Sequence, residues 1–275
     1  MNFYWIYDLP NWQLGLLIVL TFASVSVLGL FATRPVARWI LRGSGQYNDL
    51  VSWVFAGIGV FYGLALGLIA VGTWEDFSSI DSQISQEASL LASLYDDLDG
   101  YPKPLRDQLE SRLRQYTRFI VEKDWLAHRQ GLVNDEGNRR LSEFEDQVRA
   151  FDPGNEREKI AHAEVIRGIS LIDQARRLRV GSVSSGLPAA LWVVVLIGAA
   201  LNTVLLYLFW VENLLLHAIL VAIFATFVGL LIFLTAAMDN PFRGNFSVSP
   251  DAFQEVLDDV MNVPRPSTST NTPPA

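Results

Sequence analysis

The sequence contains no cysteine, which excludes disulfides, thiolate nucleophiles and cysteine-ligated metal sites. Basic residues are also few: 21 Lys and Arg stand against 29 Asp and Glu, giving a net charge of −8. Such a chain repels a phosphate backbone, and its densest basic cluster is only the short run Arg176-Arg177-Leu178-Arg179. Nucleic acid is therefore not an expected partner.

Charge of either sign is scarce, at 18% of 275 residues against about 25% in ordinary soluble domains. Four windows of 20 to 25 residues contain no Asp, Glu, Lys or Arg: Leu14–Thr33, Val51–Thr73, Leu187–Trp210 and Leu214–Met238. An uncharged apolar run of about 18 residues is long enough to cross a membrane as a helix. The sequence therefore predicts a polytopic membrane protein with four transmembrane helices and excludes a water-soluble globule.

The four spans form two antiparallel pairs on either side of a charged middle. No segment alternates with period two, whereas Phe77, Ile84, Leu91 and Leu98 recur every seven residues, as on one face of a helix. The expected fold class is all-α. The expected domains are 1–74 (first transmembrane pair), 75–186 (helical extramembrane domain), 187–238 (second hairpin) and 239–275 (C-terminal segment), the last with a disordered tail after Val263.

Localisation follows from the spans. The stretch before the first span has no basic residue, so this span is expected to be a retained anchor and not a cleaved signal. We expect a multi-pass protein of the cell inner (plasma) membrane whose first partner is the lipid bilayer. Lys and Arg near the span ends number three on one side and four on the other, which leaves the orientation open.

Residue sets typical of enzymes are missing. The three histidines, His128, His162 and His217, are far apart, and none lies in a zinc-binding H-E-x-x-H pattern. The Gly/Ser-rich stretch 181–186 lacks the Lys of a phosphate-binding loop and is interpreted as a flexible lead into the third span. We therefore expect no catalytic residue, no metal and no cofactor. The spans also lack the chain of carboxylates that a proton relay requires.

The second span has an unusual pattern of small residues. Gly59, Gly63 and Gly67 are spaced four apart, a spacing that lets helix backbones approach closely in lipid. Two interpretations remain open: the glycines pack within the chain, or the helix packs around the axis of an oligomer. In the second case the apolar positions Val60 and Leu64 face a pore, where an apolar constriction gates ions by dewetting.

Several motifs together resemble the bacterial bestrophin-like family of membrane proteins. They are Tyr47-Asn48-Asp49 before the Gly-rich span, Gly72-Thr73-Trp74-Glu75-Asp76-Phe77 at its end, Ser185-Gly186-Leu187-Pro188, and Met238-Asp239-Asn240-Pro241-Phe242-Arg243-Gly244. The resemblance extends from Trp12 to Val260. Span order, the length of the middle domain and the end motifs all agree with it.

The more distant similarity to true bestrophins, which are pentameric anion channels lined by their second helices, carries further expectations. It implies a homo-oligomer, a pentamer by analogy, that conducts small anions and has its middle domain in the cytosol. The turn after the fourth span corresponds to Asn240, Pro241 and Phe242. The pore neck corresponds to Ala56, Val60 and Leu64, which are smaller than the bulky residues of bestrophins.

One part of the bestrophin pattern is not present. Calcium-activated bestrophins have a run of acidic residues just after the turn, whereas this chain reads Arg243-Gly244-Asn245-Phe246-Ser247-Val248-Ser249. The calcium site is therefore not carried over. Two functions remain in view. One is a bestrophin-like, homo-oligomeric anion channel with the second transmembrane helix lining the pore. The alternative is a non-conducting membrane sensor or scaffold that acts through its helical extramembrane domain.

Overall fold

The computed structural model describes residues 10–40, 47–244 and 246–263. Within these ranges the chain is helical and contains no strand, so the predicted all-α fold is confirmed. The disordered tail predicted after Val263 lies outside the described residues.

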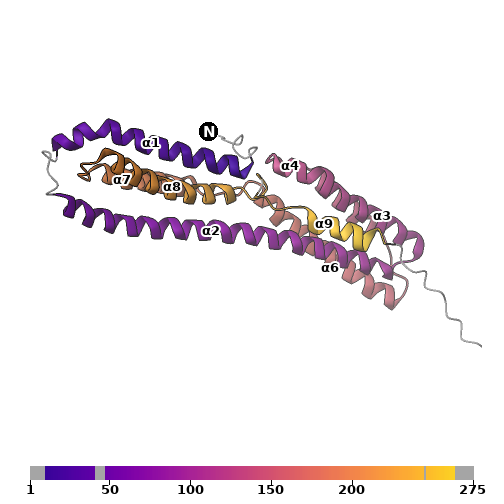
Figure 1. Cartoon of the computed structure of the whole chain (residues 1–275). Helices are drawn as coiled ribbons and strands as arrows, with labels where there is room; N and C mark the ends of the chain where they lie inside the picture. The colour runs from indigo at the N-terminus through magenta and orange to yellow at the C-terminus, as the bar shows by residue number, and fades with distance from the viewer. Residues whose placement is uncertain (1–9, 41–46, 245, 264–275) are drawn as a thin grey trace, which may run out of the picture. The chain divides into compact units, whose positions relative to one another are not determined.

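Four helices are long and apolar enough to cross a membrane, and each contains most or all of one uncharged window. They are α1 (Asn11–Ile40), α2 (Asn48–Asp97), α7 (Ala189–Tyr207) and α8 (Leu214–Met238). The 50 residues of α2 form one uninterrupted helix of about 75 Å (Figure 1). It continues past its apolar part because no Gly or Pro occurs between Thr73 and Asp99.

The described chain divides into two compact units. The membrane unit contains the residues up to Ser79 and those from Ser184 to Val248, and the extramembrane unit contains Ile80–Val183 and the residues from Ser249 onward. The segment 239–275 is therefore shared between the units. Its first ten residues belong to the membrane unit and the next ones to the extramembrane unit.

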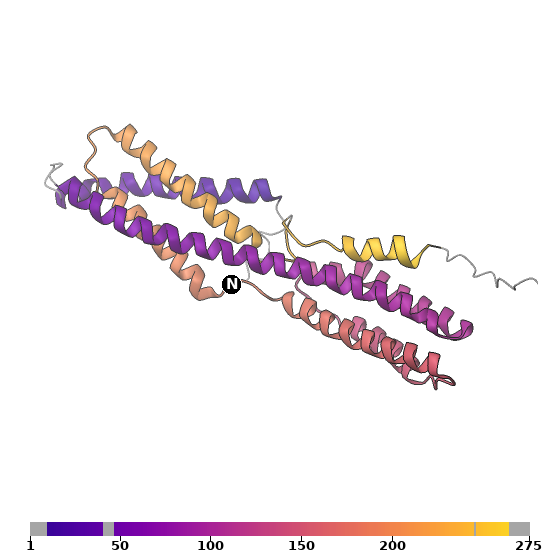
Figure 2. The ribbon, with the colours of Figure 1, turned by 90° about the horizontal axis from the view of Figure 1, so that it is seen from below.

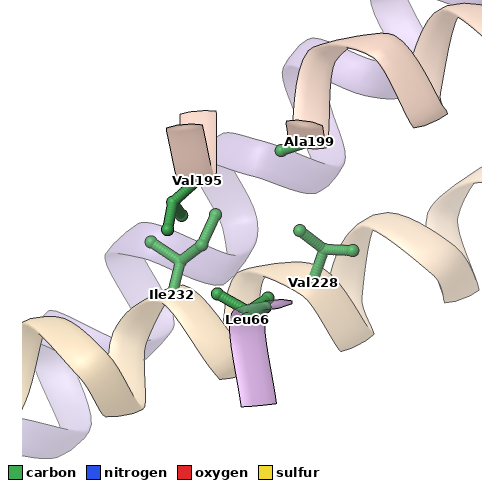
Figure 3. Packing of buried hydrophobic residues seen from close by; sticks show 5 residues of the cluster. All are labelled: Leu66, Val195, Ala199, Val228 and Ile232. Atoms are coloured by element: carbon green, nitrogen blue, oxygen red, sulfur yellow. The ribbon is translucent and has the colours of Figure 1, made fainter. Parts of the chain in front are cut away.

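In the membrane unit, α1 packs along α8 more extensively than any other described pair of helices. Gly229 permits this approach, because a Cβ at that position would lie 3.2 Å from the Cα atom of Val19. A small apolar core joins α2, α7 and α8 (Figure 3). Its buried members are Leu66, Val195, Ala199, Val228 and Ile232.

The connection between α7 and α8 is held by two polar side chains from the first helix pair. Arg34 Nη2 donates hydrogen bonds to the carbonyl oxygens of Val211 (3.0 Å) and Glu212 (3.2 Å). Asn48 pairs with the backbone of Trp210 in both directions: its Nδ2 donates to the carbonyl oxygen (2.9 Å), and its Oδ1 accepts from the N–H (2.8 Å). The C-terminal part of α1 and the start of α2 therefore lie beside the α7–α8 connection.

The extramembrane unit is built from the C-terminal part of α2 and shorter helices. These are α3 (Lys103–Phe119), the π-helical η4 (Ile120–Asp124), α4 (Trp125–Arg129), α5 (Glu136–Arg149), α6 (Glu156–Ser182), α9 (Asp251–Glu255) and η5 (Val256–Met261), after the short 3-10 turn η3 (Leu98–Gly100). Figure 2 shows α6 beside this part of α2. The heptad positions Ile84, Leu91 and Leu98 are buried here, as one apolar stripe requires.

Candidate functional site

One face of α2 is apolar and exposed along the membrane-spanning part of the helix. Val60 is 69% exposed and Leu64 60%, and Ala56 is exposed as well. The contacts of α2 with α7 and α8 use another side of the helix, where Leu66 is 1% exposed and Ile69 packs on the same core. At about 100° per residue, Val60 and Ile69 point in opposite directions.

Two of the three motif glycines of α2, Gly63 and Gly67, have no packing partner among the described residues. A Cβ at Gly63 or Gly67 would meet no atom within 4 Å, and one at Gly59 would meet only Asn202 Oδ1, at 3.7 Å. On α7, in contrast, a Cβ at Gly198 would collide with the ring of Tyr62. The described chain thus uses Gly198 for close packing and leaves Gly63 and Gly67 of α2 open, which favours the second interpretation for these two glycines.

Acidic residues lie at both ends of this face. Asp49 and Glu75 are exposed, and no charged residue lies between Val51 and Thr73. By helical periodicity Asp49 is within about 20° of Val60 around α2, and Glu75 within about 60°. Beside Glu75, Trp74 stacks on Phe77 with ring centroids 6.1 Å apart. The exposed face is therefore apolar in the middle, with a carboxylate at each end.

The residues Asn240, Pro241 and Phe242 form a turn after α8. The carbonyl oxygen of Asn240 accepts from the N–H of Arg243 (2.9 Å), and that of Pro241 accepts from the N–H of Val248 (2.8 Å). The Phe242 side chain is buried. Gly244 follows with φ 79°, a left-handed conformation that glycine adopts without strain.

Asp239, just before this turn, connects two motifs that are far apart in the sequence. Its Oδ1 accepts from the N–H of Leu187, and its Oδ2 accepts from Trp192 Nε1 at 3.4 Å. A Cβ at Gly186 would lie 3.2 Å from the carbonyl oxygen of Asp239. Burial raises the pKa of Asp239, and the two hydrogen bonds oppose that rise. The Ser-Gly-Leu-Pro motif therefore meets the end of α8.

The extramembrane unit contains a buried group of charges that the sequence analysis did not identify. The Arg179 side chain is fully buried; its Nε donates to Glu87 Oε2 (2.7 Å) and its Nη2 to Oε1 (3.2 Å). Its Nη1 donates to Asp124 Oδ2 (3.3 Å), and the guanidinium lies 5.7 Å from the ring centre of Phe253. The planar arginine thus joins α2, η4, α6 and α9.

His128 completes this charge cluster. Its Nδ1 lies 3.2 Å from Arg179 Nη1, and its Nε2 lies 3.6 Å from Asp124 Oδ1. Burial, together with the positive charge of Arg179, lowers the pKa of His128 to about 4, although Asp124 opposes the shift. The imidazole is therefore neutral at neutral pH and accepts the arginine proton at Nδ1.

The sequence carried a signal for this cluster in the run 176–179. Arg176 and Arg179 are three residues apart and share a face of α6, where both are buried. Arg177 lies on another face, is exposed and pairs with Asp173. Nowhere in the described chain, this cluster included, is a group of three or more His, Asp or Glu side chains placed to hold a metal ion. Asn245, within the segment that replaces the calcium site, lies outside the described residues.

Comparison with known proteins identifies the family. A family model described as the bestrophin-like domain matches residues 18–253. A leucine-to-threonine variant of a bacterial bestrophin homologue from Klebsiella pneumoniae has a similar fold, with TM-score 0.66, 12% identity, and coverage of 88% of this chain and 97% of that one. A second structure of the Klebsiella homologue gives TM-score 0.59 and 13% identity over 90% and 97% of the two chains.

Another crystal structure, described as a membrane protein, matches with TM-score 0.67 and 13% identity over 89% of this chain and 99% of that one. Curated protein sequences give no match. At these identities the structural matches show a shared fold. Together with the family match over most of the sequence, they establish that this chain is a membrane protein of the bestrophin-like family.

Proposed function

We propose that the protein is a homo-oligomeric ion channel in which α2 lines the pore and Ala56, Val60 and Leu64 form its neck. A pentamer is expected by analogy with bestrophins. The observation that carries this proposal is the open face of α2. Only 6% of its most apolar window is buried within the chain, against 33% for α8.

The geometry of α2 supports a position around a central axis. Its contacts with α7 and α8 leave the opposite side free, and the open Gly63 and Gly67, outside these contacts, allow neighbouring copies of the helix to approach. The side chains that then face the axis are apolar. A ring of valine and leucine side chains is a barrier to hydrated ions that opens when it widens or becomes wet.

The ion that passes is a separate question. The family resemblance favours small anions. The residues at the two ends of the α2 face favour cations, because Asp49 and Glu75 of several copies would form acidic rings at both ends of the apolar stretch. Cation conduction is therefore the second candidate, on the strength of these two carboxylates.

The test is ion flux into proteoliposomes that contain the purified full-length protein. We expect wild-type protein to conduct. Val60→Ala and Leu64→Ala are expected to increase the current severalfold, because smaller side chains widen the neck and lower the dewetting barrier. The matched control is Leu196→Ala, which truncates another exposed leucine, on α7, and is expected to leave the current unchanged.

The opposite results are equally informative. A protein that stays monomeric in detergent and lipid, or that passes no ion in either direction, contradicts the channel and leaves the non-conducting sensor or scaffold. Unchanged current in both neck variants contradicts the assignment of α2 to the pore. The reversal potential in a salt gradient distinguishes the two candidate ions by its sign.

A further inference from the structure

The membrane unit contains an apolar cavity of about 430 Å³. Its walls are formed by Phe55 of α2, Phe209 of the α7–α8 connection, and Leu220, Phe224 and Phe227 of α8. Phe55 contacts the rings of Phe209 and Phe224 edge-on, at centroid distances of 6.0 Å and 5.7 Å. Such walls favour a hydrocarbon ligand, because they offer almost no hydrogen-bonding group.

The cavity follows α8 inward from the α7–α8 connection. From His217 to Phe227, both of which line it, the helix advances ten residues, or about 15 Å. A hydrocarbon core of about 30 Å has two leaflets, so this depth corresponds to one of them. His217 is already hydrogen-bonded, through Nε2 to the carbonyl oxygen of Leu206 at 3.0 Å. The cavity has the depth of a phospholipid acyl chain.

A smaller recess at the α7–α8 connection shares Phe209, Val211 and His217 with the cavity and adds Arg34 and Arg38. Arg34 uses Nη2 for the carbonyl oxygens of the connection, while its buried Nη1 has no hydrogen-bond partner among the residues that the structure describes. Within the described residues, neither guanidinium has a carboxylate within 4.0 Å. Two cations, one of them with an unpaired buried Nη1 among the described residues, therefore lie beside the apolar cavity.

The aromatic residues place this recess at the depth of lipid headgroups. Arg38 lies over the ring of Trp210 at 5.5 Å, and Tyr207 and Trp210 both line the recess. Tyr and Trp are enriched where the hydrocarbon meets the headgroups, because their rings have one polar edge. The recess has a volume of only about 10 Å³, so it does not enclose an anion; an anion at this depth, attached to an acyl chain in the cavity, meets the two guanidinium groups at the opening of the recess.

We propose that this site binds one anionic phospholipid of the bilayer. Its phosphate binds Arg34 and Arg38 at the opening of the recess, and one acyl chain fills the cavity beside Phe55 and Phe224. Guanidinium groups bind phosphate with paired, charge-assisted hydrogen bonds. A second copy of the chain could cover the apolar walls, but it would also have to bring carboxylates to two arginines. The proposal does not depend on ion conduction.

The experiment is native mass spectrometry of the full-length protein purified with equal amounts of phosphatidylglycerol and phosphatidylcholine. We expect wild-type protein to retain phosphatidylglycerol in preference. Arg38→Gln is expected to weaken this retention about tenfold, the value of one charge-assisted hydrogen bond. Arg34→Gln is the less direct of the two variants, because Arg34 also holds the α7–α8 connection through its hydrogen bonds. The control is Arg157→Gln, which changes an exposed arginine of the extramembrane unit.

A substitution inside the cavity tests the binding of the acyl chain separately from that of the phosphate. Ile223→Trp fills the cavity and is expected to reduce retention of both lipids, whereas Val194→Trp, at an exposed position of α7 outside the cavity, is expected to have no effect. Equal retention of the two lipids, or an unchanged preference in Arg38→Gln, overturns the proposal. It is also overturned if Ile223→Trp changes the oligomeric state and leaves lipid retention intact, or if inorganic phosphate binds while phosphatidylglycerol does not.

Discussion

At the scale of single residues, two neighbouring arginines of α6 show how environment determines what a charge does. Arg177 pairs with Asp173 in solvent, and screening leaves such a surface pair with little effect on stability. Arg179 is buried between Glu87 and Asp124. Removing it would leave two carboxylates in a low-dielectric interior without their counter-charge, which is far more costly than losing a surface contact.

We therefore expect Arg179→Leu to destabilise the extramembrane unit by about 3–5 kcal/mol, the usual effect of breaking a buried ion pair. Arg177→Leu, two positions earlier on the same helix, is the matched control and is expected to change little. Thermal unfolding of the full-length protein, followed by circular dichroism, measures both. An equal loss of thermal stability in the two variants would contradict the role given to the buried cluster.

At the scale of secondary-structure elements, α2 combines a long continuous helix with a span that is scarcely packed. Its length could be predicted from the sequence, because helix continuity is a local property and no helix breaker occurs between Thr73 and Asp99. Which way its glycines face could not be predicted, since spacing alone does not say whether α7 or another copy covers them. The structure shows that α7 contributes its own glycine, Gly198, to the contact between α7 and α2.

This difference between glycines gives a test of assembly. Gly63→Leu adds a side chain where nothing lies within 4 Å in the chain, so we expect the protein to fold as before but to shift from oligomer to monomer. Gly198→Leu is the counterpart, because its side chain would collide with Tyr62 and lower the thermal stability of the fold. Mass measurement in detergent and thermal unfolding separate the two effects. An oligomer unchanged by Gly63→Leu would place this face against lipid instead.

The spans could be predicted from consecutive residues, whereas the charge cluster and the cavity are formed by residues that are far apart in the sequence. The four spans follow from runs of uncharged residues, each visible within 25 positions. Arg179, in contrast, finds Glu87 at a separation of 92 residues and Asp124 at a separation of 55. The cavity walls also come from separate segments, with Phe55 on α2 and Phe224 on α8. Contacts of this kind depend on tertiary packing, which spacing along the chain does not reveal.

At the scale of the whole molecule, the distribution of charge decides what an assembly of these chains would conduct. The net charge of −8 is a property of the whole chain, but only residues on the pore side act on a permeating ion at short range. In the proposed pore these are Asp49 and Glu75, one at each end of an uncharged stretch. Repetition by symmetry turns each carboxylate into a ring.

We therefore expect the double variant Asp49→Asn and Glu75→Gln to move the reversal potential in a salt gradient toward that of anions, because neutral rings no longer attract cations or repel anions. The matched control is Asp76→Asn, since Asp76 follows Glu75 directly but lies about 160° from Val60 around α2. Neutralising Asp76 changes the net charge but leaves the rings of Asp49 and Glu75 intact, so the reversal potential should stay the same. If both variants shift it equally, selectivity depends on the overall charge and the two acidic rings do not set it.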